Sequence, residues 1–521
     1  MASNSAAKTV AAKKGPAVPG RKVVRVVFLA LLLDLLAFTM PLPLFPRLIE
    51  DFVRKEALDP SATPTFLSQT LYAVRSLRAY LFSFAPSSSQ ARLSEFPAQW
   101  DLTILGGLLA ALFSFCQFFI SPFLGRLSDR YGRKNVLLAT MVGNLASAVL
   151  WLAADSFGLY AASRIVGGLS EGNVQLSIAC ITDVTSPATR SRSLALVGIA
   201  FAVAFTLGPS VGAYFSSRVI GHGSVITLPS ILADLPGFPA HVKLNSYAVP
   251  AAITLVLLTL ETIYLALCLP ETRGWAKKVD EEPATIKNTA AVAPPSRTPA
   301  ERVKRLRRLE RVHFLFLFFF AGAEFTLTFL THNFFSFSNL QNGRLLGFIG
   351  ILSSLLQGGY VRRRASTPLR TASLAHSGVR TCAIALFLLA GLPHLASTGK
   401  EAGAKWALWS AAAGLAFVSA TVVNSLNALA SFETDPELSS TTTNAPTDPR
   451  LEKGAAIGRF RSRGQLGRAL GPLVTTALYF TVSPTWAYGV CGVGMLGVVT
   501  AVAGVAREER EREKGEGKKV Q

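Results

Sequence analysis

Two long apolar runs, residues 102–124 and 135–154, flank ten residues that include four basic side chains and one acid. Each run is long enough to cross the core of a lipid bilayer, which takes about 20 residues at about 1.5 Å of rise per residue. The segment between them, residues 125–134, is therefore predicted to be a tight hairpin at one face of a membrane. The alternative is a basic loop that only anchors the chain to the membrane surface.

The composition favours a protein with many membrane spans. Of the 521 residues, 50% are hydrophobic, and the mean hydropathy is +0.39. The formal net charge of +21 could suggest a nucleic-acid-binding protein, but the basic residues fall in alternate loops and form no patch interleaved with aromatic residues. The five cysteines lie inside or at the ends of apolar runs, so we expect neither a disulfide framework nor a metal site. Without a nucleotide-binding motif or a set of nucleophile, base and acid, we expect neither a cofactor nor an enzyme.

The apolar runs predict an all-α membrane protein with twelve spans in two halves. The expected spans are 23–45, 102–124, 135–154, 157–181, 194–215, 247–269, 312–330, 344–360, 381–396 and 406–432, one that contains 471–472 and ends near 479, and one that ends near 506. These predict a tail (1–22), a six-helix bundle (23–270), a mid-chain loop (271–311), a second six-helix bundle (312–506) and a charged tail (507–521). Two such repeats surround a midplane site in transporters.

The charge distribution predicts the topology. Basic residues are in excess in the first tail, the loop 125–134, the mid-chain loop, residues 362–370, residues 459–463 at the basic end of span eleven, and the last tail. Because basic loops stay on the cytosolic side, both termini are expected in the cytosol. The first tail is read as a disordered basic flank, with a targeting peptide as the alternative. Between spans one and two, apolar residues at helical spacing from 67 to 81 predict an amphipathic helix on the opposite surface.

Polar residues inside the spans are the candidates for function, because a charge at the centre of a bilayer costs about 3 kcal/mol. They fall in spans one, four, seven and ten, which are equivalent positions of the repeats, and their polar faces can line a central cavity. The candidates are Asp34, Arg164, Glu171, Gln175, Glu324, Thr328, Asn424 and Asn427. Structural hydrogen bonding between helices is the alternative for Asp34, Glu324 and the two asparagines. Glu261 in span six has no assigned role.

Two further sets of residues concern movement. In the loop 125–134, the candidates for a gate are Gly125, Asp129, Arg130, Gly132, Arg133 and Lys134. Asp129 could accept hydrogen bonds from backbone donors or cations of the other bundle, and so hold the cytosolic side closed. Glycine–proline pairs that kink a membrane helix and permit close packing are Gly208, Pro209 and Gly212 in span five and Gly471 and Pro472 in span eleven.

Several of these motifs carry a family resemblance. The pattern G-x-L-x-D-R-x-G-R-K at 125–134 resembles the loop of the major facilitator superfamily. Residues 33–39, 164–168 and 208–212 resemble the first, fourth and fifth helices of its drug:proton antiporter group, although Ala195, Ala204 and Ala213 stand where glycines are expected. Residues 170–173, 270–272 and 324–332 resemble the eukaryotic tetracycline transporter-like proteins. That resemblance implies transport of organic anions and amphipathic drugs.

The sequence therefore predicts a secondary active transporter of small organic molecules that uses alternating access and is coupled to protons through Asp34. If Arg164 is paired with an acid, the cavity favours cationic or neutral amphipaths; if it is free, it offers a bidentate site for an anion, which we favour. The expected partners are the substrate, protons and the lipid bilayer, with the chain a monomer in the plasma membrane or in a vacuolar or other endomembrane. The alternatives are a non-transporting receptor or scaffold on the same fold, and a facilitator of another class of solute.

Overall fold

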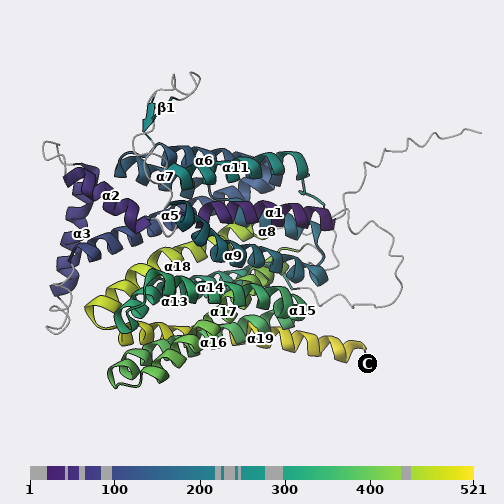
Figure 1. The fold of residues 1–521 in the computed structure, drawn as a ribbon. Coiled ribbons are helices and arrows are strands. Elements are labelled where there is room, and N and C mark those ends of the chain that lie inside the picture. Colours follow the sequence, from purple (N-terminus) through teal and green to yellow (C-terminus); the bar gives the residue numbers. More distant parts are fainter. Residues whose placement is uncertain are drawn as a thin grey trace, which may run out of the picture.

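The computed structural model describes residues 20–41, 45–57, 65–83, 97–216, 225–227, 241–243, 248–275, 297–365, 367–435 and 448–520. The tail 1–19 and most of the mid-chain loop lie outside these residues. The described part is helical except for two short strands, β1 (Val225–Thr227) and β2 (His241–Lys243), which pair antiparallel. Long helices lie side by side with their axes along one direction (Figure 1).

The helices of the first half pack mainly with one another. Their bounds are α1 (Gly20–Thr39), α5 (Pro97–Tyr131), α6 (Arg133–Leu152), α7 (Phe157–Ser170), α8 (Asn173–Val184), α9 (Pro187–Ser216) and α11 (Ala248–Cys268). In this half α1 packs against α9, α11 and α8, while α6 packs against α7 and α11. Two further helices, α2 (Phe45–Ala57) and α3 (Phe66–Ser83), lie at one end of the bundle (Figure 1).

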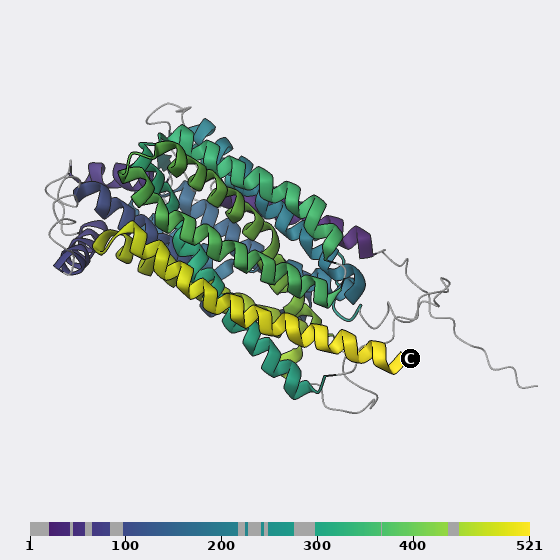
Figure 2. The same ribbon diagram turned by 90° about the horizontal axis from the view of Figure 1, so that it is seen from below.

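The second half forms a matching bundle. Its helices are α13 (Pro299–Phe335), α14 (Asn339–Leu356), α15 (Arg362–Arg364), α16 (Pro368–Ser397), α17 (Glu401–Phe432), α18 (Lys453–Thr481) and α19 (Pro484–Val520). A π-helical turn, η2 (Gln357–Val361), joins α14 to α15, and a 3-10 turn, η4 (Pro449–Leu451), precedes α18. Here α13 packs on α18, and α16 packs on α17 and α19. The view from below shows α19, in yellow, running along the bundle to the C-terminus (Figure 2).

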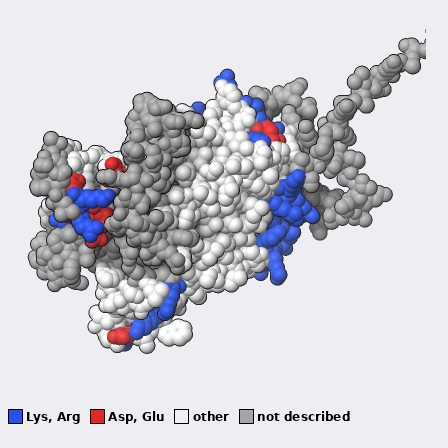
Figure 3. Space-filling model, turned by 45° about the horizontal axis from the view of Figure 1, so that its top comes forward, with Lys and Arg blue, Asp and Glu red and all other residues white. Residues whose placement is uncertain are grey.

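The described structure is suited to a membrane. Among the described helices, nine are long and apolar enough to cross one: α5, α6, α9, α11, α13, α14, α16, α17 and α19. The other expected spans are too charged or too short, because α1 carries Lys22, Arg25 and Asp34, α18 carries four arginines, and span four is divided into α7 and α8. On the face drawn in Figure 3, charged side chains gather toward the two ends, and the described surface between them is almost entirely uncharged.

The start of α1 and the end of α19 lie at the same end of the bundle (Figure 1), which we call the terminal end. At the opposite, far end, α2 and α3 cover the helices. Leu67, Leu71 and Val74 of α3 are buried, as the apolar spacing predicts. They pack in a cluster with residues of α2, α5 and α7, so this helix covers the first bundle rather than standing apart from it.

The helix ends differ from the expected spans in three places. The segment expected as a ten-residue hairpin is helical as far as Tyr131, and the turn is made by Gly132, whose φ of 96° favours glycine. In the expected mid-chain loop, α13 already begins at Pro299, because Thr298 and Glu301 form a capping box. At the other terminus α19 continues to Val520, through the tail that follows the last apolar run.

The two bundles approach most closely where α5 meets α18. A Cβ atom on Gly125 would overlap the carbonyl oxygen of Gly454, and one on Gly454 would overlap the carbonyl oxygen of Gly125. The hydroxyl of Ser462 also donates to the carbonyl of Phe118 at 2.7 Å. On the other side of the molecule α9 packs against α14 and α17. Gly125, a candidate for the gate, thus permits the close approach of α5 to α18.

We expect Gly125→Ala to destabilise the folded state by about 1–3 kcal/mol, because the added methyl group has to push two backbones apart. Thermal unfolding of the purified protein in detergent measures this. The matched control is Gly347→Ala in α14, where a Cβ atom meets nothing within 4 Å. Equal melting temperatures for the two variants would contradict the assigned packing.

Candidate functional site

The fourth expected span is broken at its middle. The helix α7 ends at Ser170 and α8 begins at Asn173, with Glu171 and Gly172 between them. Consequently Arg164, Glu171 and Gln175 do not share the single continuous helical face that their spacing predicted. Gln175 is buried and donates from Nε2 to the carbonyl of Ser121 on α5 at 3.1 Å. The prediction was wrong on this point because it assumed that the helix continues through the glycine.

Asp34 lies inside the first bundle, with only 3% of its surface exposed. Asn173, the first residue of α8, donates from Nδ2 to its Oδ1 at 2.8 Å. A second contact holds this asparagine, because Thr140 donates to its Oδ1 at 3.3 Å. The break in span four therefore brings a hydrogen-bond donor to the carboxyl of span one. Sequence reasoning missed Asn173, since its partner is 139 residues away.

Three of the predicted candidates meet in one cavity. Asp34, Arg164 and Glu171 line it together with Asn144 and Thr254, and its volume is about 50 Å³. The guanidinium of Arg164 lies over the rings of Trp151 and Tyr160, at 5.9 and 5.5 Å from their centroids. Its buried Nε has no hydrogen-bond partner, and no acid in the described part of the chain forms an ion pair with it. A volume of this size holds water rather than an organic molecule.

Opposite these residues, α18 contributes two arginines that the sequence analysis did not single out. Arg461 interacts electrostatically with both Asp34 and Glu171 across the two bundles, and Arg468 does so with Glu324 on α13. In the orientation that suits its neighbours, the amide of Gln465 accepts from Arg461 at 3.2 Å and donates to Gln117 of α5 at 3.2 Å. The seven-residue spacing of Arg461 and Arg468 places both on one face of the helix. This spacing is the sequence feature from which the pair could have been predicted.

The remaining candidates lie elsewhere in the bundle. Glu324 has an exposed side chain and Thr328 a half-buried one, while Asn424 and Asn427 are buried in α17. Asn424 lies against α9, since a Cβ atom on Gly198 would overlap its amide. Asp34, Arg164 and Glu171 thus line one cavity, whereas Gln175 and Asn424 lie where two helices pack against each other. Glu261, which had no assigned role, is 1% exposed, and its Oε2 has no partner among the described residues.

The glycine–proline pairs lie inside continuous helices. Pro209 is within α9 and Pro472 within α18. At Gly208 a Cβ atom would overlap the hydroxyl of Thr39 in α1, and that hydroxyl donates to the carbonyl of Ala204 at 2.9 Å. Gly212 and Gly471 lie against the carbonyls of Met40 and Phe318 in the same manner. These glycines allow neighbouring helices to approach closely, as their sequence context predicted.

The terminal end is closed by contacts between the bundles. Asp129, near the end of α5, accepts from the backbone amides of Gly454 at 2.9 Å and Ala455 at 2.7 Å. These amides open α18, where the positive end of the helix dipole also favours a carboxylate. Arg133 joins the same site, with Nη1 at 2.7 Å from Asp129 and Nε at 3.0 Å from Asp183. Two further basic residues of the loop lie outside this site: Arg130 lies over the ring of Tyr131, and Lys134 donates to the carbonyl of Ala266 in α11.

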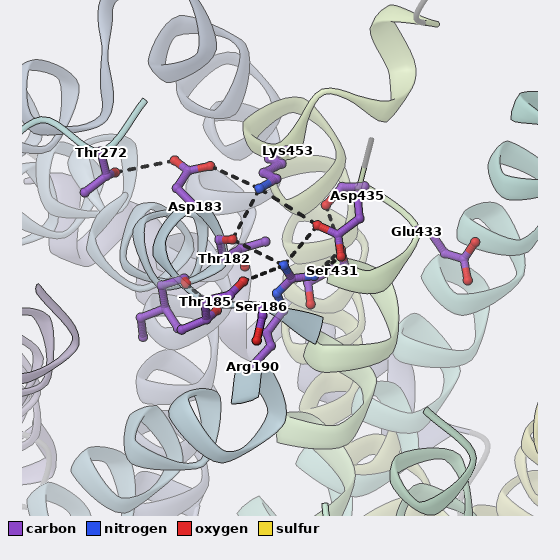
Figure 4. A network of polar contacts seen from close by, with 12 residues as sticks. Thr182, Asp183, Thr185, Ser186, Arg190, Thr272, Ser431, Glu433, Asp435 and Lys453 are labelled. Atoms are coloured by element: carbon purple, nitrogen blue, oxygen red, sulfur yellow. Dashed lines mark hydrogen bonds and ion pairs between the residues drawn. The ribbon is translucent and has the colours of Figure 1, made fainter. Parts of the chain in front are cut away.

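A second set of ion pairs extends this closure (Figure 4). Arg190 of α9 makes a bidentate pair with Asp435, which follows α17, at 2.5 and 2.9 Å. Lys453 lies between the bundles, with Nζ at 3.5 Å from Asp183 and 3.9 Å from Asp435. The network is buried, so breaking it exposes unpaired charges and is costly. Sequence reasoning did not find Arg190, Asp435 or Lys453, because their partners come from the other half of the chain.

We expect Asp129→Asn to open the terminal end. The asparagine amide loses the charge that pairs with Arg133 and presents an NH₂ group to one of the two backbone amides, a loss of about 1.5 kcal/mol or tenfold in the closed population. Maleimide labelling of Ser462→Cys, in a background without the five native cysteines, measures the opening. Asp155→Asn, at an exposed residue between α6 and α7, is the control. Unchanged labelling of the Asp129 variant would contradict a gating role.

Comparison with known proteins identifies the family. The model of the Major Facilitator Superfamily matches residues 27–445. The mouse protein "Major facilitator superfamily domain-containing protein 10" is 33% identical over 484 residues, which cover 90% of this chain and 90% of that protein. A class H tetracycline resistance protein from Pasteurella multocida is 32% identical over 120 residues, 23% of this chain and 30% of that protein.

A solved structure agrees with these relatives. The crystal structure of the human organic anion transporter MFSD10 (TETRAN) matches 94% of this chain and 100% of that chain, with a TM-score of 0.66 and 28% identity. The resemblance noted in the motifs is thereby confirmed. The chain belongs to the major facilitator superfamily, a family of multi-pass membrane transporters and not of enzymes.

Proposed function

We propose that this transporter moves organic anions and is coupled to protons, with the terminal end of the bundle in the cytosol and twelve spans in total. The observation that carries the proposal is the placement of Arg461 and Arg468 on the face of α18 that is directed at the acids of the other helices. The likeness to the human organic anion transporter MFSD10 supports the same substrate class.

The charges around the site favour an anionic substrate. Arg164 contributes a guanidinium with no ion pair to a described acid, and Arg461 and Arg468 contribute two more from α18. An arginine keeps its charge at any physiological pH and binds a carboxylate through two parallel hydrogen bonds. The opposing acids lose their charge when they bind protons. A protonated site is therefore net positive and attracts an anion.

Proton coupling follows from the position of Asp34. Its carboxyl is buried, faces Asn173 and interacts electrostatically with Arg461 of the other bundle. When Asp34 and Glu171 are ionised, they offset the charge of Arg461; when they bind protons, Arg461 becomes available to a substrate carboxylate. Proton and anion are thus bound together, which predicts that a proton gradient drives anion accumulation. Since the cavity of about 50 Å³ is too small for an organic molecule, the far end has to open before the substrate enters.

Arg461→Gln is expected to lower uptake of an arylacetic acid into proteoliposomes by about tenfold or more, because a charge-assisted hydrogen-bond pair is lost. The measurement is the initial rate across a range of substrate concentrations. Arg362→Gln, an exposed arginine of α15, is the matched control and should transport like the parent. If the Arg461 variant transports and is inhibited by carboxylates as the parent is, the anion site is not there.

Asp34→Asn is expected to abolish uptake driven by a proton gradient while exchange of substrate on the two sides continues. The asparagine mimics the protonated carboxyl and cannot release a proton. The two assays use the same proteoliposomes, with Glu401→Gln at the exposed start of α17 as the control. Accumulation of substrate against its gradient by Asp34→Asn would contradict the coupling role.

A further inference from the structure

A second cavity lies at the terminal end, outside the site already described. It is formed between the first turns of α13, the first turns of α18 and the turn η4, and its volume is about 640 Å³. Five arginines line it and a single acid, Glu310, opposes them. The arginines are Arg307, Arg311, Arg450, Arg459 and Arg463. None of these residues takes part in the gate at Asp129 or in the electrostatic contacts of Asp34.

Among the described residues, most of these arginines have no carboxylate partner within ion-pair distance. Glu310 is 3.6 Å from Arg459, whose guanidinium also donates to the carbonyl of Arg450. In the described part of the chain no ion pair is formed by Arg307, Arg311 or Arg463. Their neighbours on α13 differ in this respect, because Arg305 and Arg308 pair with acids of α19, at Glu509 and Glu508. The local acids are therefore used by the neighbouring arginines, and the cavity retains a strong positive charge.

The two kinds of arginine on α18 point in opposite directions. With 100° per residue, Arg459 and Arg463 lie on one face, and Arg461 and Arg468 lie on the opposite face, which is directed at the acids of the cavity. We call the face of α18 that carries Arg459 and Arg463 its outer face. This face continues through Leu466 and Leu470 to Val474, whose side chain is 43% exposed. An apolar, exposed side chain at this depth in a membrane helix contacts lipid. The arginine cavity is thus the end of a stripe that faces the bilayer.

The walls of the cavity are apolar. Leu306 and Val303 are buried, and Phe314 and Leu466 are half-buried beside the arginines. Arginine side chains at a membrane boundary above an apolar groove fit a molecule with an anionic head and an apolar body. A soluble anion such as inorganic phosphate can pair with the arginines but has no apolar part to bury in the groove.

We propose that this cavity binds the headgroup of an anionic membrane lipid that carries more than one phosphate, with its acyl chains along the outer face of α18. Phosphate groups accept paired hydrogen bonds from guanidinium groups, and the anionic lipids of a cell membrane are concentrated in its cytosolic leaflet. The bound lipid bridges α13 and α18. Since α18 also carries the amides that bind Asp129, occupancy of the cavity stabilises the position of that helix. Lipid binding in this cavity does not depend on which substrate is transported, but it rests on the proposed cytosolic position of the terminal end.

The test uses the purified full-length protein in mixed micelles and a headgroup-labelled phosphatidylinositol bisphosphate, with binding followed by fluorescence. Arg459→Gln/Arg463→Gln is expected to weaken binding by about tenfold or more. Arg362→Gln/Arg363→Gln removes two exposed arginines of α15, alters the net charge equally and should bind like the parent. If thermal unfolding shows that the first variant is unstable, Arg307→Gln/Arg311→Gln on the opposite wall replaces it. The same weakening of lipid binding is expected for that variant.

Four results would overturn the proposal. Equal binding by the cavity variants and the parent would remove the site. An equal loss of lipid binding in the α15 control variant would mean that binding reflects only general attraction between charges. The competition arm uses phosphatidylserine at matched total charge and soluble inositol trisphosphate. If phosphatidylserine displaces the labelled lipid as effectively as unlabelled phosphatidylinositol bisphosphate does, the site does not select a headgroup with several phosphates. If inositol trisphosphate displaces it equally well, the acyl chains play no role in binding.

Discussion

The backbones of α5 and α18 touch at Gly125 and Gly454, and the closed terminal end depends on that contact. Because neither residue has a side chain, the carboxylate of Asp129 can reach the first amides of α18. Those amides are the positive end of a helix that carries Arg461 further along. A shift of α18 relative to α5 would therefore separate Asp129 from these amides and move Arg461 away from Asp34 in one motion. We propose that alternating access uses this coupling.

Electrostatics explains why the charges of α18 are arranged as they are. Arginines inside a bilayer need a partner or a water-filled space. Arg461 and Arg468 interact with acids of other helices, and their seven-residue spacing keeps them on one face. Arg459, which precedes Arg461, and Arg463, which lies between Arg461 and Arg468, are on the opposite face of the helix. One helix thus carries both the charge that we propose for the substrate and the charge that we propose for a lipid.

Much of the fold follows from apolar length, loop charge and the motif at 125–134, because membrane helices must satisfy their backbone polar groups internally. The cavity of Asp34, Arg164 and Glu171 differs from the predicted one, because the described residues that line it all come from the first half of the chain, whereas the sequence predicted a central cavity shared with spans seven and ten. The break at Glu171 and Gly172 was not predictable, because helical spacing alone does not show where a glycine ends a helix. Nor were Asn173, Arg190 and Asp435, whose partners come from distant segments. Arg461 was grouped with the basic end of span eleven, although its spacing from Arg468 distinguishes it.

The central claim is that the site selects a negative charge, and a substrate series of one shape tests it most directly. Uptake into proteoliposomes of an arylacetic acid, its primary amide and the corresponding amine, each measured with and without an inwardly directed proton gradient, separates charge from size and hydrophobicity. The account predicts that only the acid is accumulated and that the gradient increases its uptake. Preferential transport of the amine, or equal transport of all three, would contradict it.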